Sequence, residues 1–146
     1  MIKKLNLLGG TVAVLFYVSA IGVFLLRLAG MSEFTRWLGY FEFLLALPLI
    51  YLLIKAPQAE RPPLYYVQIG LILAWLAVEL VLDYILMLDF RQAFWMVIIY
   101  VVLFFAGSGG LLGVATLAGK KWKIAAVVLF LIMAVLAFVQ REVTGM

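Results

Sequence analysis

LYYVQIGLILAWLAVELVLDYILML, residues 64–88, is the stretch that decides the fold of this chain. It is almost entirely apolar, and about 20 such residues are enough for an α-helix to cross the hydrocarbon core of a bilayer. Two carboxylates, Glu79 and Asp83, interrupt the apolar run one helical turn apart. A charged side chain near the bilayer centre costs about 2.5–3.5 kcal/mol on insertion scales. We therefore expect both acids to face the interior of a helical bundle.

The composition of the whole chain also indicates a membrane protein. Of its 146 residues, 68% are hydrophobic and 12% are charged, whereas a soluble domain has about 45–50% apolar and about 25% charged residues. The formal net charge is +4, but the basic residues lie near the N-terminus and in short connections, where they orient membrane helices. The charge does not indicate a nucleic-acid partner. We expect a single transmembrane helical domain over residues 1–146, with membrane lipid around it.

Apolar runs alternate with polar connections, and this pattern predicts an all-α bundle of five transmembrane helices. Pro48 is expected to kink the second span. A loop with three prolines is expected before the third span, and the short connection 89–92 predicts an antiparallel hairpin between the third and fourth spans. The predicted spans cover about 5–29, 34–54, 64–88, 93–118 and 122–139.

The basic residues also predict the orientation of the bundle. Positive residues concentrate on the cytoplasmic side of membrane proteins. If the N-terminus is inside, most of the eleven Lys and Arg residues fall on the inner side. We therefore expect the N-terminus inside and the C-terminus outside, in the plasma (inner) membrane of a prokaryote. The inner segments contain Lys3, Lys4, Lys55, Arg61, Lys120, Lys121 and Lys123, and the outer segments contain Arg27, Arg36, Arg91 and Arg141.

The acidic residues of the second and third spans are predicted to lie at similar depths. With a helical rise of about 1.5 Å per residue, Glu42 and Glu79 each lie about 5 Å outward of the midpoint of their span, and Asp83 about 10 Å outward. One stripe of the third span also carries Gln68 and Trp75. We therefore predict a binding site for a proton, an ion or a small molecule in the outer half of the membrane, with candidates Glu42, Gln68, Trp75, Glu79 and Asp83.

A purely structural role for the same acids is the alternative. Polar side chains inside membranes often only join helices. In that case Arg27 is the expected partner of Glu79, and Arg91 or Arg36 the expected partner of Asp83.

The fourth span contains a cluster of small residues. Gly109 and Gly113 have the GxxxG spacing that allows helix backbones to approach closely in lipid. We predict that both glycines pack against another helix, in the same chain or in a partner. A broken helix that lines a cavity is the alternative.

The chain contains no cysteine and no histidine. This composition excludes disulfides, thiol redox chemistry and haem held by histidine or cysteine, and it argues against a zinc site. We expect no metal and no cofactor, and the chain is not expected to be an enzyme.

Three classes of function agree with these features. The first is a small transporter or channel-like protein with a membrane-embedded acidic site for a proton or a cationic or other small-molecule substrate. The second is a non-catalytic membrane subunit or assembly factor that packs against a partner membrane protein. The third is a lipid-binding protein or membrane enzyme. Homo-oligomerisation is plausible for so small a bundle.

Overall fold

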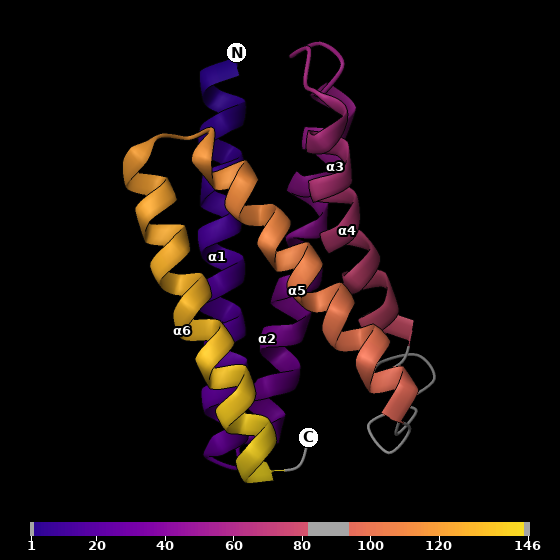
Figure 1. The fold of residues 1–146 in the computed structure, drawn as a ribbon, viewed down its shortest axis with the longest axis vertical. Coiled ribbons are helices and arrows are strands. Elements are labelled where there is room, and N and C mark those ends of the chain that lie inside the picture. The colour runs from indigo at the N-terminus through magenta and orange to yellow at the C-terminus, as the bar shows by residue number, and fades with distance from the viewer. Residues whose placement is uncertain (1, 82–93, 145–146) are drawn as a thin grey trace.

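The computed structural model describes residues 2–81 and 94–144, and this part of the chain is helical with no strand (Figure 1). The expected all-α class is therefore confirmed. The helices are α1 (Ile2–Leu28), α2 (Ser32–Leu44), α3 (Ala46–Lys55), α4 (Pro63–Glu79), α5 (Phe94–Thr116) and α6 (Lys120–Thr144).

Four helical stretches in the described part of the chain are long and apolar enough to cross a membrane. They are Lys3–Leu28, Glu33–Lys55, Trp95–Thr116 and Lys120–Val143, and the second of them combines α2 and α3. The predicted third span begins as α4, a shorter apolar helix. Its far end and the predicted hairpin connection fall within residues 82–93, outside the described residues. Helix α6 continues past residue 139, where the predicted fifth span ends, through Gln, Arg and Glu, which are good helix formers.

The second span is interrupted at one residue, Leu45, which lies three residues before Pro48 and keeps a right-handed helical backbone with φ of −65° and ψ of −18°. Helix α2 ends at Leu44 and α3 begins at Ala46. Proline has no N–H to donate to the carbonyl group four residues earlier, here that of Leu44, and its ring crowds that carbonyl. The break therefore lies one turn before the proline, directly after the turn of α2 that carries Glu42.

Helix α1 lies at the centre of the bundle, in contact with α2, α3, α5 and α6. Gly30, with φ of 76°, ends α1 in the left-handed conformation that glycine adopts without strain. The N–H of Met31 then donates to the carbonyl oxygen of Leu26 at 2.9 Å, which turns the chain so that α2 packs back against α1.

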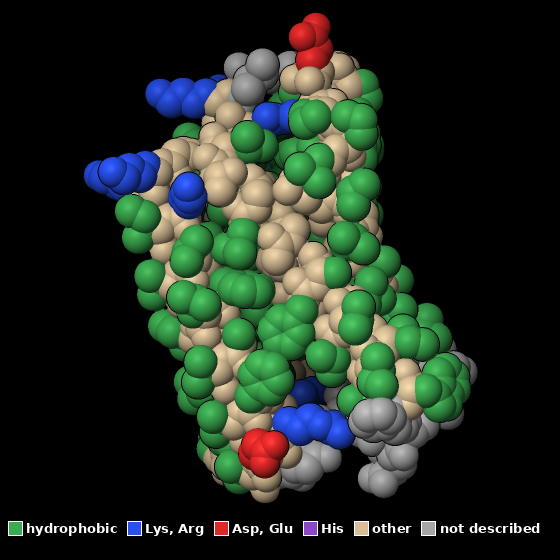
Figure 2. Space-filling model, in the orientation of Figure 1, with side chains coloured by type: hydrophobic (Ala, Val, Ile, Leu, Met, Phe, Trp, Pro, Cys, Tyr) green, Lys and Arg blue, Asp and Glu red, His purple; other side chains and the backbone are tan. Residues whose placement is uncertain are grey.

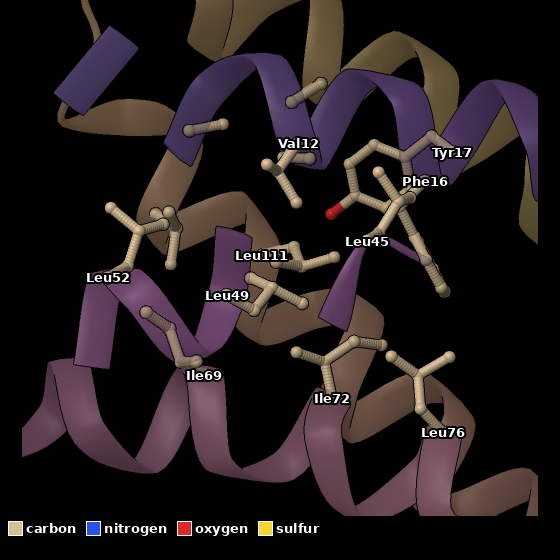
Figure 3. Packing of buried hydrophobic residues seen from close by; sticks show 14 of the residues in the cluster. Val12, Phe16, Tyr17, Leu45, Leu49, Leu52, Ile69, Ile72, Leu76 and Leu111 are labelled. Atoms are coloured by element: carbon tan, nitrogen blue, oxygen red, sulfur yellow. The ribbon is translucent and has the colours of Figure 1, made fainter. Parts of the chain in front are cut away.

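The core is formed where α1, α3, α4 and α5 meet (Figure 3). Tyr17 of α1 is fully buried there, and its hydroxyl donates a hydrogen bond to the backbone carbonyl of Ser108 on α5. Other fully buried core side chains come from all four helices: Val12, Phe16, Leu49, Leu52, Ile69, Ile72 and Leu111.

The close approach of α4 and α5 depends on glycines, but not on Gly109. A Cβ built on Gly107 would lie 2.9 Å from the Cα atom of Ile72, and one on Gly110 would lie 2.9 Å from the backbone oxygen of Gln68. A Cβ on Gly113 would meet the Gln68 side chain, whereas none of the described atoms lies within 4 Å of one on Gly109. Gly113 therefore faces another helix of the same chain, whereas Gly109 faces none of the described helices.

The two termini lie at opposite ends of the bundle (Figure 1). Charged side chains gather at both ends of the face seen in Figure 2, and apolar side chains cover its middle. At the N-terminal end, the Arg61 guanidinium donates a hydrogen bond to the side-chain oxygen of Asn6 and lies 4.8 Å from the centre of the Tyr65 ring. These contacts join the start of α1 to the connection between α3 and α4.

Candidate functional site

A cavity of about 90 Å³ lies between α1, α2, α4, α5 and α6. Most of its lining is aliphatic or aromatic, but the exceptions are strongly polar and come from four different helices. We call this space the acidic cavity. Its polar and aromatic lining residues are Phe24, Arg27, Glu42, Trp75, Glu79, Tyr100, Phe104, Phe105, Gln140 and Arg141.

Glu42 reaches the acidic cavity from α2. Its side chain is 4% exposed, and its carboxyl group lies within electrostatic range of Glu79 and Arg27, with the Ser19 hydroxyl beside it. Ser19 and Arg27 both belong to α1. The packing of α2 against α1 therefore places Glu42 near the Ser19 hydroxyl and the Arg27 guanidinium. Helix α4 contributes the second acid, Glu79.

Glu79 is the last α-helical residue of α4 and is 8% exposed. The Tyr100 hydroxyl of α5 donates a hydrogen bond to its Oε1 atom, with an O–O distance of 3.2 Å. Because α4 packs against α5 through the glycine contacts described above, the tyrosine and the acid are held at the same level. Two buried carboxylates from helices far apart in sequence thus line one cavity.

Trp75 lies one turn before Glu79 on α4 and is 3% exposed. The rings of Phe16, Tyr100 and Phe104 surround its indole, with centroid distances of 5.7, 6.0 and 5.0 Å. Its Nε1 atom is buried and has no hydrogen-bond acceptor among the described residues. The indole is thus well packed by aromatic rings, and its buried N–H group has no acceptor among the described residues.

The acidic cavity extends toward one end of the bundle. It contacts α1 from Ala20 to Arg27, which is about 10 Å along a helix axis. Arg27 lies in the last turn of α1 and Arg141 in the last turn of α6. Figure 2 shows basic side chains between the lower ends of α5 and α6. The arginines therefore lie near the end of the bundle, and the acids lie deeper.

The structure brings together only part of the set predicted from the sequence. Glu42, Trp75 and Glu79 line the cavity, as does Arg27. Gln68 does not, because it lies 11 residues before Glu79, about 16 Å along α4, where it packs against Gly110 and Gly113.

None of the remaining predicted residues, Arg36, Asp83 and Arg91, can be placed at the cavity. Arg36 does not line the cavity: it is exposed, and its Nε atom donates to the Tyr40 hydroxyl at 3.1 Å. Asp83 and Arg91 lie outside the described residues.

Three polar residues of the cavity were missed by the sequence analysis, namely Tyr100, Gln140 and Arg141. Tyr100 could have been predicted, because its hydroxyl group is a polar group inside an apolar run and would need a hydrogen-bond partner there. Gln140 and Arg141 follow the last apolar run and were interpreted only as its end. Their inward position depends on how α6 packs along α1, which the sequence pattern does not reveal.

The donor set favours protons and hydrogen bonds over metal coordination. Among the described residues, no group of three or more Asp, Glu, His or Cys side chains is placed to hold a metal ion. Ca²⁺ takes about six to eight oxygen ligands, so two acids would hold it only together with several other oxygen atoms. A carboxyl group, in contrast, needs only one partner to take up or release a proton.

Comparisons with known proteins give no relative from which a function could be transferred. No protein-family model, no curated protein and no solved structure matches the chain.

Proposed function

We propose that this chain is a small integral membrane transport protein, and that Glu42 and Glu79 form its site for a proton or a small cation. The observation that carries the proposal is the meeting of these two buried acids, from α2 and α4, in one cavity. Ionisable residues are expensive inside a membrane and commonly mark proton relays or ion paths.

The arrangement of polar groups along the bundle supports this proposal. The ends of the face in Figure 2 are charged and its middle is apolar, as a membrane-spanning bundle requires. The acidic cavity leads from that apolar middle toward the end that carries Arg27 and Arg141. Under the predicted orientation, with the N-terminus inside a prokaryotic plasma membrane, this end faces outward.

The size of the cavity limits the substrate. Pockets for drug-sized ligands have volumes of about 300–1,000 Å³, and the acidic cavity has about 90 Å³. A proton, a small ion or a few water molecules fit this space. A bulky organic cation would require a rearrangement of the helices.

Flux measurements with purified protein in vesicles test the proposal. The vesicles contain a pH-sensitive dye, and a pH gradient is imposed with sodium, potassium or choline as the main cation. We expect faster dissipation of the gradient than in protein-free vesicles. Glu79→Gln and Glu42→Gln keep the side-chain shape but cannot release a proton, and each is expected to abolish the added flux.

Glu142→Gln is the matched control, because Glu142 is exposed on α6 and does not line the cavity. It should transport like the wild type. Undiminished flux in Glu79→Gln would refute the role of the acid. Wild-type flux no greater than that of protein-free vesicles would refute transport and favour a non-catalytic membrane subunit, which co-purification with other membrane chains would then reveal.

A further inference from the structure

Positive charge is concentrated at the N-terminal end of the bundle, where Glu60 is the one acid among the described residues. The opposite end is more nearly balanced, because its three described arginines lie with the exposed acids Glu33 and Glu142. The N-terminal end therefore favours a negatively charged partner. Its basic residues are Lys3, Lys4, Lys55, Arg61, Lys120, Lys121 and Lys123.

Helices α1 and α6 form a corner at this end. A Cβ built on Gly10 of α1 would lie 3.2 Å from the Trp122 ring and 2.7 Å from Cβ of Ala118, so α6 begins at the level of Gly10. Helix α1 continues about two turns beyond that level (Figure 1). Lys3 lies seven residues before Gly10, close to two full turns, and therefore on the same side of α1, about 10 Å beyond the start of α6.

The first turn of α6 adds three lysines to this corner. Lys120, Lys121 and Lys123 are exposed, as is Lys3. Helical side chains lean toward the N-terminus of their helix, so the three lysines of α6 lean toward the end of the bundle and the level of Lys3. Figure 2 shows basic side chains around the starts of α1 and α6. We call these four lysines the basic corner.

An exposed apolar stripe continues along α6 from Lys121. Ile124, Val128, Leu131 and Val135 follow it at the three- and four-residue spacing of one helix face, and their exposed fractions are 53, 49, 57 and 61%. The stripe is about 16 Å long, close to half of the roughly 30 Å hydrocarbon core of a bilayer. Because α6 packs against α1 and α5 on its other side, none of the described helices covers this stripe.

We propose that the basic corner binds the headgroup of an anionic phospholipid, whose acyl chains lie along the stripe of α6 that begins below Lys121. Ammonium groups form strong, charge-assisted hydrogen bonds with phosphate oxygens. A zwitterionic lipid carries its own cation and gains less from four lysines. A soluble anion or a nucleic acid would meet the lysines but would leave the apolar stripe uncovered.

The predicted orientation agrees with this ligand. With the N-terminus inside, the basic corner faces the cytoplasmic leaflet, whose surface is negative because of anionic lipids. The inference rests on the membrane location contained in the proposed function, but it does not require transport.

Thermal unfolding of the delipidated full chain in a neutral detergent tests the ligand. Phosphatidylglycerol, phosphatidylcholine and inorganic phosphate are added in separate titrations. A ligand that binds only the folded state raises the Tm, so we expect phosphatidylglycerol to raise it well above the values with the other two. Phosphatidylcholine that is equally effective would overturn the preference for anionic lipid. Inorganic phosphate that reproduces the whole shift would overturn the lipid in favour of a free anion.

A matched pair of variants tests the location. Lys121→Gln should raise the lipid fraction needed for the half-maximal shift about fivefold, which corresponds to about 1 kcal/mol for one basic residue near an anionic surface. Lys121→Arg keeps the charge and should behave like the wild type. Arg36→Gln removes one exposed positive charge at the opposite end and should leave the titration unchanged. Equal weakening by Lys121→Gln and Arg36→Gln would overturn the assignment to the basic corner.

These titrations are independent of the flux assay. Flux in vesicles without a preference for phosphatidylglycerol would overturn the lipid site while transport stands. A preference that depends on Lys121 in a chain without flux would overturn transport and support the lipid site.

Discussion

The Tyr100 hydroxyl on α5 donates a 3.2 Å hydrogen bond to Oε1 of Glu79 on α4. This bond couples the packing of the two helices to the position of a buried acid. Tyr100 also contacts the Trp75 ring, with a centroid distance of 6.0 Å. One side chain thus positions both polar residues that α4 contributes to the cavity.

Tyr100→Phe tests this coupling. The variant keeps the ring against Trp75 but removes the donor to Glu79. Side-chain hydrogen bonds in membrane bundles contribute about 0.6 kcal/mol on average and at most about 1.7 kcal/mol. We expect a loss of roughly that size in the free energy of unfolding, measured by denaturation in mixed micelles, and a clear reduction in proton flux. Tyr66→Phe, at an exposed position of α4, should change neither quantity.

The glycines of α5 provide a matched pair of substitutions. A methyl group at Gly110 would lie 2.9 Å from backbone oxygen and 3.0 Å from Cα of Gln68, neither of which can rotate away. We expect Gly110→Ala to destabilise the bundle by about 1–3 kcal/mol, typical of overpacking. Gly109→Ala meets none of the described atoms within 4 Å, so it should be neutral or stabilising by up to about 1 kcal/mol from helix propensity.

A bulkier change at Gly109 tests for a partner. Gly109→Leu should leave thermal stability and assembly state unchanged if that face meets only lipid. If Gly109→Leu lowers the thermal stability or disrupts the assembly, another chain packs against Gly109, which is the partner contact that the GxxxG spacing predicts. Thermal denaturation and size-exclusion chromatography in detergent measure the two quantities.

Pro48→Ala tests the break between α2 and α3. Alanine supplies the missing N–H to the Leu44 carbonyl, so a continuous helix becomes possible. This would rotate Glu42 relative to the buried face of α3. We therefore expect unchanged or higher thermal stability together with lower proton flux. Pro57→Ala, in the exposed connection after α3, should leave flux intact, and equal flux in both variants would show that the break does not position Glu42.

The sidedness of the bundle is testable with terminal tags. The two termini lie at opposite ends of the structure (Figure 1), and the positive-inside pattern predicts the N-terminus in the cytoplasm. In intact cells, external protease should therefore remove a C-terminal tag and spare an N-terminal one. Removal or protection of both tags would contradict the prediction.

The depth argument from sequence anticipated part of the site. It gave Glu42 and Glu79 the same height, and the structure has both acids lining one cavity. The same stripe argument included Gln68, which instead packs against Gly110 and Gly113. The helical spacing of residues tells in which direction a side chain points, but not what it meets there. On this face of α4, Gln68 meets the glycines of α5, whereas Glu79, about three turns further along, meets the cavity.

The sequence by itself determined that the chain is helical and where most helices lie, because long apolar runs must satisfy their own backbone hydrogen bonds. It also determined the break near Pro48, which follows from a single missing N–H group. Only the tertiary structure decided that Tyr100, Gln140 and Arg141 join Glu42, Trp75 and Glu79 around one cavity. Such a grouping depends on which helix faces fit together, and that fit is set by side-chain shapes on helices far apart in the chain, including the glycine contacts that bring α4 against α5.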